Sequence, residues 1–372
     1  MTKILIVRLG ALGDILHALP AATAIRRALP EATLGWLVEE RWSELLTARR
    51  HKHSPVDRGP QKPVVDLVHT VNTARWRRRF FRPATLKEIR GGFKRVRDTR
   101  YDIILDFQGN IKSGFFAWLG GAPVIAGYVD PRESAARLFY SHKFSRSGDH
   151  VIEQNLALAA QTLKDHVGLA ELPMTAPQLP RDPAGEAWAE REIQRLGIAS
   201  FAIVNPGAGW GGKQWPAERF GQVAAALATH NIKTLVNVGP GEETLGQAVA
   251  GASKSNAFLL NCTVGQLIAI TRRARLFVGG DTGPLHLAAA LGVPAVGLYG
   301  PTDPARTGPF GPNTIALRHP ESETTFSHHR RPEEGLLKID AEEVIAAARH
   351  LLASKPVSSN QVAGKPVESS HA

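Results

Sequence analysis

The chain has 372 residues, of which 43% are hydrophobic and 21% charged, a composition typical of a folded protein with about two globular domains. Its single cysteine, Cys262, excludes a disulfide framework and fits a reducing compartment. The formal net charge of +11 indicates either a solvated basic surface or a partner that carries phosphate or carboxylate groups.

Short apolar runs alternate with helical patterns from the first residues onward. This alternation predicts strands at 3–9, 33–38, 64–71, 102–108 and 124–128. Helices are expected between them, at 14–29, 84–98, 112–119 and 149–168. Because Arg8 and Asp14 interrupt the first apolar run, we do not expect a signal peptide there. We also expect no transmembrane helix, since the longest apolar stretch contains a histidine, glycines and a proline.

A proline-rich segment, residues 171–185, predicts an extended linker, after which the alternation restarts. Strands are expected at 201–207, 233–239, 257–261, 275–280 and 294–300. Helices are expected at 216–229, 242–252, 264–272, 283–291 and 340–353. Such alternation is typical of parallel sheets covered by helices on both faces. The sequence therefore predicts an α/β protein with two Rossmann-like domains, residues 1–170 and 186–353, that face each other across a cleft.

Two segments are expected to lie outside this framework. The tail, residues 354–372, has too few apolar residues to fold, and we expect it to be disordered. Residues 49–63 are rich in charged residues and proline, which predicts a mobile surface loop.

The stretch GGDTGPLH, residues 279–286, lies between a predicted strand and a predicted helix. Ligands of parallel α/β sheets bind at the carboxyl ends of the strands. Asp281 and Thr282 are candidates for the N-cap, and Gly283 lets a ligand approach the backbone closely. The helix start favours a phosphate group, to which His286 could donate a hydrogen bond. The alternative is an ordinary capped helix that binds nothing.

The stretch RLGALGD, residues 8–14, occupies the equivalent place after the first predicted strand. It lacks the GxGxxG pattern of dinucleotide-binding proteins. Asp14 opens the following helix, and a carboxylate in this position could act as a general base. The alternative is that Asp14 only caps the helix.

Two further turns follow strands of the second half. NPGAGWGGKQWP, residues 205–216, contains Lys213, whose mobile positive charge suits a diphosphate. VGPGEET, residues 238–244, contains Glu242, which could accept hydrogen bonds from ribose hydroxyls. The alternatives are a solvated loop lysine and a glutamate that only interacts with the helix dipole.

A basic run covers residues 73–100 and interleaves arginines with aromatic residues. Arginine forks suit phosphate and carboxylate groups, and the aromatic residues would also suit a nucleic acid or a membrane interface. The alternative is a solvated helix face. The arginines concentrate at Arg75, Arg77, Arg78 and Arg79.

Several familiar motifs are missing from the sequence. It has no Asp-x-Asp pair of the kind that holds a divalent ion on a sugar nucleotide, no P-loop and no GxSxG elbow. The histidine clusters at 51–53 and 327–331 lie in predicted loops, where we expect no metal. We therefore predict neither a metal site nor a cofactor.

Two of these motifs carry a resemblance to a known family. ILIVRLGALGDILHALPA near the start and GGDTGPLHLAAALGVPAVGLYGPTDP near the end resemble the bacterial lipopolysaccharide heptosyltransferases of glycosyltransferase family 9. The resemblance covers the chain except for the tail and the 49–63 loop. DFQG, residues 106–109, and the PRESAARLFY stretch favour the type I enzymes.

The resemblance implies a GT-B fold and transfer of L-glycero-D-manno-heptose from ADP-heptose to the Kdo of the lipopolysaccharide inner core, with Kdo-lipid A as the acceptor. It implies inversion of the anomeric centre by direct displacement, without a metal or cofactor. The implied protein is a cytoplasmic monomer in peripheral contact with the inner membrane, with no nucleic-acid partner.

The resemblance also implies roles for individual residues. Asp14 would deprotonate the acceptor hydroxyl, and Glu242 would bind the ribose. The donor diphosphate would be held by Lys213 and by Asp281, Thr282, Gly283 and His286. The anionic acceptor would be held by Arg75, Arg77, Arg78, Arg79, Gln108 and Lys112.

Two other functions stay open at this stage. A heptosyltransferase II, or another family 9 enzyme with a different donor or acceptor, would share the same motifs and differ in acceptor preference. A non-catalytic protein that binds nucleic acid through the basic run would bind oligonucleotides tightly and salt-dependently, with no role for Asp14.

Overall fold

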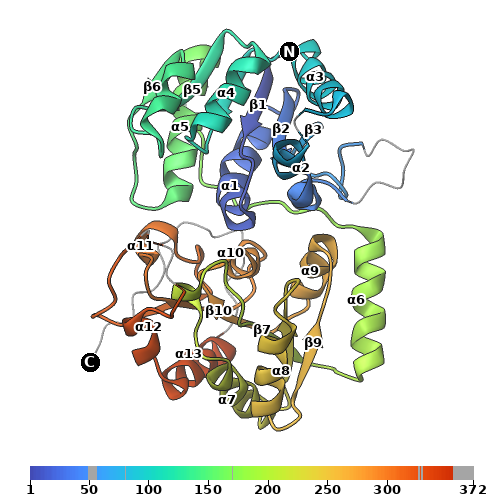
Figure 1. Ribbon diagram of the computed structural model, residues 1–372, viewed down its shortest axis with the longest axis vertical. Helices are drawn as coiled ribbons and strands as arrows, with labels where there is room; N and C mark the ends of the chain where they lie inside the picture. The colour runs from blue at the N-terminus through green and yellow to red at the C-terminus, as the bar shows by residue number, and fades with distance from the viewer. Residues whose placement is uncertain (49–56, 80, 170, 326, 328–329, 355–372) are drawn as a thin grey trace. The chain divides into compact units, whose positions relative to one another are not determined.

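The computed structural model describes residues 1–48, 57–79, 81–169, 171–325, 327 and 330–354. The chain forms two compact units that divide between Asp182 and Pro183 (Figure 1). Part of the predicted 49–63 loop, residues 49–56, and residues 355–372 of the predicted tail lie outside the described residues.

Unit 1 is built on a parallel six-stranded sheet in the order β3-β2-β1-β4-β5-β6. Its strands are β1 Lys3–Val7, β2 Thr33–Glu39, β3 Leu67–Val71, β4 Ile103–Asp106, β5 Val124–Tyr128 and β6 His142–Phe144. Its helices are α1 Leu12–Ala28, α2 Thr73–Arg78, α3 Pro83–Asp98, α4 Ile111–Gly120 and α5 Val151–Val167, with 3₁₀ turns η1 Glu40–Leu45 and η2 Ser134–Phe139. Of the central strands, β4 is buried along its whole length and β1 from Ile4 to Val7, because helices cover both faces.

Unit 2 repeats this topology with the order β12-β11-β10-β7-β8-β9. Its strands are β7 Phe201–Asn205, β8 Lys233–Asn237, β9 Ala257–Leu260, β10 Leu276–Gly280, β11 Ala295–Tyr299 and β12 Thr314–Arg318. Its helices are α6 Pro183–Leu196, α7 Ala217–Ala228, α8 Glu243–Ala252, α9 Val264–Thr271, α10 Gly283–Ala290, α11 Pro304–Thr307, α12 Glu334–Lys338 and α13 Ala341–Ala353, with the 3₁₀ turn η3 Gly211–Lys213.

The strands and helices predicted from the apolar runs are confirmed within a few residues at their ends. Six helices and strands were not predicted: the edge strands β6 and β12, helix α6, and the short helices α2, α11 and α12. The proline-rich segment has no helix or strand over residues 171–182, and Pro183 then begins α6. Proline suits this first helical position because its fixed φ matches the helix and the missing N–H has no partner there anyway.

Each unit has an apolar core on its own sheet. In unit 1, apolar side chains from β1, β4 and α4 pack with the aromatic rings of Trp76, Phe93 and Phe116. In unit 2, Trp215 and Phe220 pack edge to face, 4.8 Å between ring centroids, among buried side chains of β7, β10 and α13. These cores hold the strand ends, and therefore the turns that follow them, in fixed positions.

Candidate active site

In both sheets the strand order reverses between two neighbouring central strands, β1 and β4 in unit 1 and β7 and β10 in unit 2. Ligands of open α/β sheets bind outside the carboxyl ends of the strands at such a reversal. Turns that the sequence singled out follow all four of these strands, and the turn that contains Glu242 follows β8. Each unit therefore presents one candidate site.

Asp14 lies in the first turn of α1, three positions after the N-cap residue, which is Ala11. Its Oδ2 accepts a hydrogen bond of 2.8 Å from the Ala11 amide, and its Oδ1 lies 2.7 Å from the Arg8 guanidinium. Asp14 is thus not the N-cap residue that the alternative interpretation assumed, although it does satisfy one amide of the helix start. Its side chain is 39% exposed, so both contacts orient the carboxylate while leaving it accessible.

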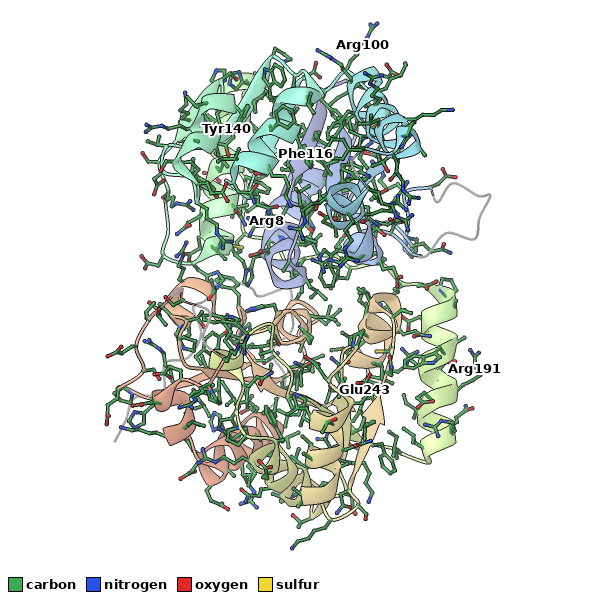
Figure 2. The ribbon with its side chains drawn as sticks, in the orientation of Figure 1. Arg8, Arg100, Phe116, Tyr140, Arg191 and Glu243 are labelled. Carbon is green, nitrogen blue, oxygen red and sulfur yellow. The ribbon has the colours of Figure 1, made fainter. Side chains whose placement is uncertain are left out.

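Arg8 connects this carboxylate to the neighbouring strand. Its side chain is only 9% exposed, and the guanidinium also donates to the Phe107 carbonyl, directly after β4. Figure 2 shows Arg8 where β1 meets α1. The Leu9 amide donates to Gln108 Oε1 at 2.7 Å, which adds a second link between the two turns. Asp14 and Gln108, both predicted site residues, therefore belong to one hydrogen-bonded edge of the sheet.

Asp106 holds the turn that presents Gln108. Its carboxylate is fully buried and accepts hydrogen bonds of 2.7 Å from both Ser113 Oγ and the Tyr140 hydroxyl. The amides of Gln108 and Gly109 also donate to it, at 2.9 and 3.3 Å. Burial raises the pKa of Asp106, and these four hydrogen bonds act against that rise. The network fixes the loop between β4 and α4.

Lys112, at the start of α4, lies next to the beginning of the basic run. Its Nζ is 3.4 Å from Thr73 Oγ1 and 3.9 Å from the Glu39 carboxylate. Within the arginine cluster, Arg75 pairs with the Glu88 carboxylate of α3 and is therefore partly neutralised. The other three predicted acceptor arginines, Arg77, Arg78 and Arg79, are exposed.

In unit 2 the predicted lysine and aspartate contact each other. Lys213 Nζ lies 2.5 Å from Asp281 Oδ2 and 3.4 Å from the Asp281 carbonyl oxygen. Their side chains are 14% and 8% exposed. Gly280 makes this approach possible, because a Cβ there would lie 2.9 Å from the Lys213 carbonyl oxygen.

Asp281 is the centre of a small charged cluster. Its other oxygen, Oδ1, lies 3.0 Å from His286 Nε2, and the Thr302 hydroxyl donates to Oδ2 at 2.8 Å. Burial alone would raise the pKa of Asp281, but the hydrogen bond and charge of His286 and the charge of Lys213 outweigh it and hold the pKa well below its usual range. Asp281 is therefore ionised and orients two groups that could contact an anion.

The start of α10 offers backbone donors beside this cluster. Thr282 is the N-cap residue, and its hydroxyl donates to the Gly280 carbonyl instead of capping the helix. The amides of Leu285 and His286 donate to the Thr282 carbonyl, and the Asp281 amide donates to Leu298 of β11. Among the described residues at the start of α10, the amides of Thr282 and Gly283 are therefore the ones that could donate to a bound anion.

Glu242 is the N-cap residue of α8, and its Oε2 accepts a hydrogen bond of 2.8 Å from the Gly239 amide. A Cβ on Gly207, in the turn after β7, would lie 2.2 Å from Glu242 Oε2. The carboxylate thus lies against the turn that leads to Lys213. Asn205 links the same turn to α10, since its Nδ2 donates to the Gly207 carbonyl at 2.8 Å and to Thr282 Oγ1 at 3.4 Å.

The described residues contain neither a cluster of metal-ligating side chains nor a helix that could span a membrane. No group of three or more His, Cys, Asp or Glu side chains in that part of the chain is arranged to hold a metal ion. Likewise, none of the helices that the structure describes is both long and apolar enough to cross a membrane.

Residues 89–336, more than half of the chain, match the sequence model of glycosyltransferase family 9 (heptosyltransferase). The chain belongs to glycosyltransferase family 9. Lipopolysaccharide heptosyltransferase 1 of Pseudomonas aeruginosa is 29% identical to it over 322 residues, which are 85% of this chain and 83% of that relative.

Solved structures of the family agree in fold with this family 9 enzyme. The E. coli heptosyltransferase WaaC with ADP is 26% identical, with a TM-score of 0.75 over 94% of this chain and 100% of that one. The same protein with ADP-2-deoxy-2-fluoro heptose is 26% identical, with a TM-score of 0.71 over 94% and 99% of the two chains. The likeness confirms the predicted α/β fold of GT-B type and the prediction that the chain is a glycosyltransferase.

Sequence reasoning missed three residues that orient the predicted ones in this family 9 enzyme. Arg8 and Asp106 each follow or end a buried strand, which is the same signal that identified Asp14 and could have found them. Thr302 lies 21 residues after Asp281 and has no comparable signal in the sequence.

Proposed function

We propose that this enzyme transfers L-glycero-D-manno-heptose from ADP-heptose to the Kdo of the lipopolysaccharide inner core, as a heptosyltransferase of type I. The proposal rests on the cluster around Asp281, in which Lys213, His286 and the start of α10 lie together where the strand order of a Rossmann-like sheet reverses. This is the arrangement expected of a diphosphate-binding site. The 29% identity to a lipopolysaccharide heptosyltransferase 1 supports the choice of sugar and acceptor.

We assign the donor to unit 2. Lys213 has three N–H bonds, and the two hydrogen bonds to Asp281 leave one for a phosphate oxygen. The amides of Thr282 and Gly283 would bind the same diphosphate, and His286 would donate to it or to the heptose. Glu242 would accept hydrogen bonds from the ribose. The binding of ADP and of a fluorinated ADP-heptose to the related WaaC supports this assignment.

We assign the acceptor to unit 1, with Asp14 as the general base. The partly exposed carboxylate would take the proton of the attacking Kdo hydroxyl, while Arg8 and the Ala11 amide keep it in place. Gln108 and Lys112 lie at the same edge of the sheet or beside it and would contact the sugar. The arginines at 75 and 77–79 would hold its carboxylates and the lipid phosphates.

The reaction would be one direct displacement with inversion. The acceptor oxygen forms a bond to the anomeric carbon as the bond from that carbon to the diphosphate oxygen breaks, and ADP leaves with the electron pair. Negative charge therefore grows on the diphosphate. Lys213 and the oriented amides would stabilise that charge more strongly in the transition state than in the ground state, which is what accelerates the step.

The test is to incubate the purified protein with ADP-heptose and Kdo-lipid A, with a chelator present, and to measure ADP release. The proposal expects release that requires the acceptor and survives chelation. Release only with an acceptor that already carries heptose would instead indicate a type II enzyme. Absence of release with either acceptor, from protein that still binds ADP, would refute the proposed acceptors.

A further inference from the structure

Helix α4 exposes an apolar stripe although its opposite face is buried in the core of unit 1. Ile111, Phe115 and Trp118 are 46%, 40% and 55% exposed. Their spacing of four and three residues places them on one side of the helix. Phe116 lies on the other side, is buried, and is seen within unit 1 in Figure 2. The stripe is therefore an extra apolar face and not the packing face of the helix.

Turn η2 extends this face with Leu138, which is 80% exposed. Gly114 allows η2 to pack closely on α4, because a Cβ there would lie 2.9 Å from the Phe139 ring. Phe115 stacks on Trp118 with ring centroids 5.9 Å apart, and it meets Phe139 edge to face at 6.0 Å. We name the exposed set Ile111, Phe115, Trp118 and Leu138 the α4 surface.

Cationic side chains border the α4 surface. Arg97 of α3 lies over the C-terminal end of α4, since a Cβ on Gly121 would be 3.2 Å from its Nε. Arg137 is exposed and precedes Leu138 in η2, and Arg132 is exposed just before η2. Glu133, whose carboxylate accepts a hydrogen bond of 2.8 Å from the Ile111 amide, places one negative charge among these arginines. Three arginines against one carboxylate leave this set of charges positive.

We propose that the α4 surface docks onto a lipid bilayer that contains anionic lipids. Exposed aromatic and aliphatic side chains with arginines around them fit the boundary between acyl chains and negatively charged headgroups. Tryptophan prefers that boundary because its ring is apolar and its N–H is polar. A second copy fits less well, because a two-fold contact would bring the same arginines toward each other.

The α4 surface also adjoins the acceptor residues within unit 1. Ile111 follows directly on the turn that Asp106 holds, and Lys112 is its neighbour in the same helix turn. A bilayer at this face would present a lipid-linked sugar near Gln108 and Lys112. In this respect the inference rests on the proposed function, because it assumes a lipid-linked acceptor.

The first test is sedimentation of the full-length protein with vesicles of phosphatidylcholine alone and with added phosphatidylglycerol. The wild type should bind the anionic vesicles more tightly. The variant Trp118→Ser with Leu138→Ser should lose at least about tenfold in vesicle affinity, because burying one large apolar side chain is worth roughly ten- to a hundredfold. A matched control, Val129→Ser with Leu337→Ser, removes two other exposed apolar side chains and should bind as the wild type does.

The second test concerns the charges. Arg97→Gln with Arg137→Gln should weaken binding to anionic vesicles by roughly fivefold for each arginine removed, and should leave binding to neutral vesicles unchanged. Thermal denaturation checks that every variant folds. The inference would be overturned if the Trp118 and Leu138 double variant and the Arg97 and Arg137 double variant both bound vesicles as tightly as the wild type. A wild-type dimer that becomes a monomer in the Trp118→Ser, Leu138→Ser variant would assign the surface to a second copy and also overturn it.

Turnover separates this inference from the proposed function. With a soluble acceptor that lacks acyl chains, the Trp118→Ser, Leu138→Ser variant should turn over as the wild type does. With Kdo-lipid A in anionic vesicles its rate should fall about tenfold, in line with the loss of binding. If the wild type transfers heptose to neither acceptor, the proposed function fails, and the vesicle binding still decides whether the α4 surface meets a bilayer.

Discussion

The substitution Asp281→Asn should destabilise the protein, because it removes the negative charge that pairs with Lys213 and His286. Asparagine has nearly the same shape, so the change tests charge without creating a cavity. One carbonyl oxygen remains to accept from Thr302, but the buried ammonium of Lys213 loses its counter-charge. An uncompensated charge in a buried site is costly.

The size of the effect follows from the burial of the pair. Both side chains are less than 15% exposed, so solvent screens their interaction only weakly. Removing one partner of a buried ion pair costs about 3–5 kcal/mol, and the remaining hydrogen bond places this case near about 3 kcal/mol. For a domain of this size that corresponds to a fall in Tm of roughly 6–12 °C. Adding Lys213→Met removes the orphaned charge and should recover part of the loss.

Denaturation of the two single variants and the double variant, followed by circular dichroism, gives the coupling energy of the pair. We expect a coupling of about 1–3 kcal/mol. If the costs of Asp281→Asn and Lys213→Met simply add, to within about 0.5 kcal/mol, the two side chains do not interact and the assignment of the cluster is wrong.

Four further predictions follow from the site. In Asp14→Asn, which keeps an oxygen to accept from the Ala11 amide, kcat should fall at least about a hundredfold while ADP binds normally by calorimetry; a kcat near that of the wild type would refute the role of general base. Lys213→Met should raise the Kd of ADP by roughly ten- to a hundredfold through loss of a charged hydrogen bond, and the exposed Lys254→Met should not; equal affinities would contradict a phosphate contact. Glu242→Gln should raise the Kd of ADP about tenfold, whereas the neighbouring and exposed Glu243→Gln, visible in Figure 2, should leave it unchanged; the reverse order would assign the ribose to Glu243. The pKa of Asp281 is lower in the folded state than its unfolded value of about 3.9, so its ionised form stabilises the fold above that pH and this contribution is lost as the pH falls below it. Urea denaturation should therefore show that the difference in unfolding free energy between the wild type and Asp281→Asn becomes smaller below about pH 4. A difference that stays constant would contradict the lowered pKa.

Most of the fold could be predicted because its signals are local. Buried parallel strands have helices on both faces, so stretches such as 201–204 and 295–299 are continuous apolar runs. The two edge strands that were not predicted have no such run: His142–Phe144 is short and only partly buried, and Thr314–Arg318 has only three consecutive apolar residues. Helix α6 was missed because it follows directly on a proline-rich segment, where Pro183 starts a helix instead of continuing the extended chain.

The candidate site could be predicted only in part, for a related reason. The residues that end strands or begin helices, such as Asp14 and Asp281, are visible in the sequence by their place next to apolar runs. Their partners are set by the packing of distant turns, and Lys213 is 68 residues away from Asp281 in the chain. A sequence pattern could therefore name both residues as candidate donor ligands, but it could not predict that Asp281 pairs with Lys213 and His286.

Each unit has a charged side chain paired with an oppositely charged partner in its candidate site, and the signs are reversed between the two units. In each, a charged side chain follows the first central strand and is held by a more buried partner of opposite charge: Asp14 by Arg8, and Lys213 by Asp281. The partner orients the group, and the hydrogen bonds that each pair makes to backbone or hydroxyl groups reduce the cost of burial. A carboxylate is what a proton-accepting step requires, and an ammonium is what a departing diphosphate requires. The same topology, with the signs of the two charges reversed between the units, thus supplies both a proton acceptor and a cation for the leaving diphosphate of the proposed transfer.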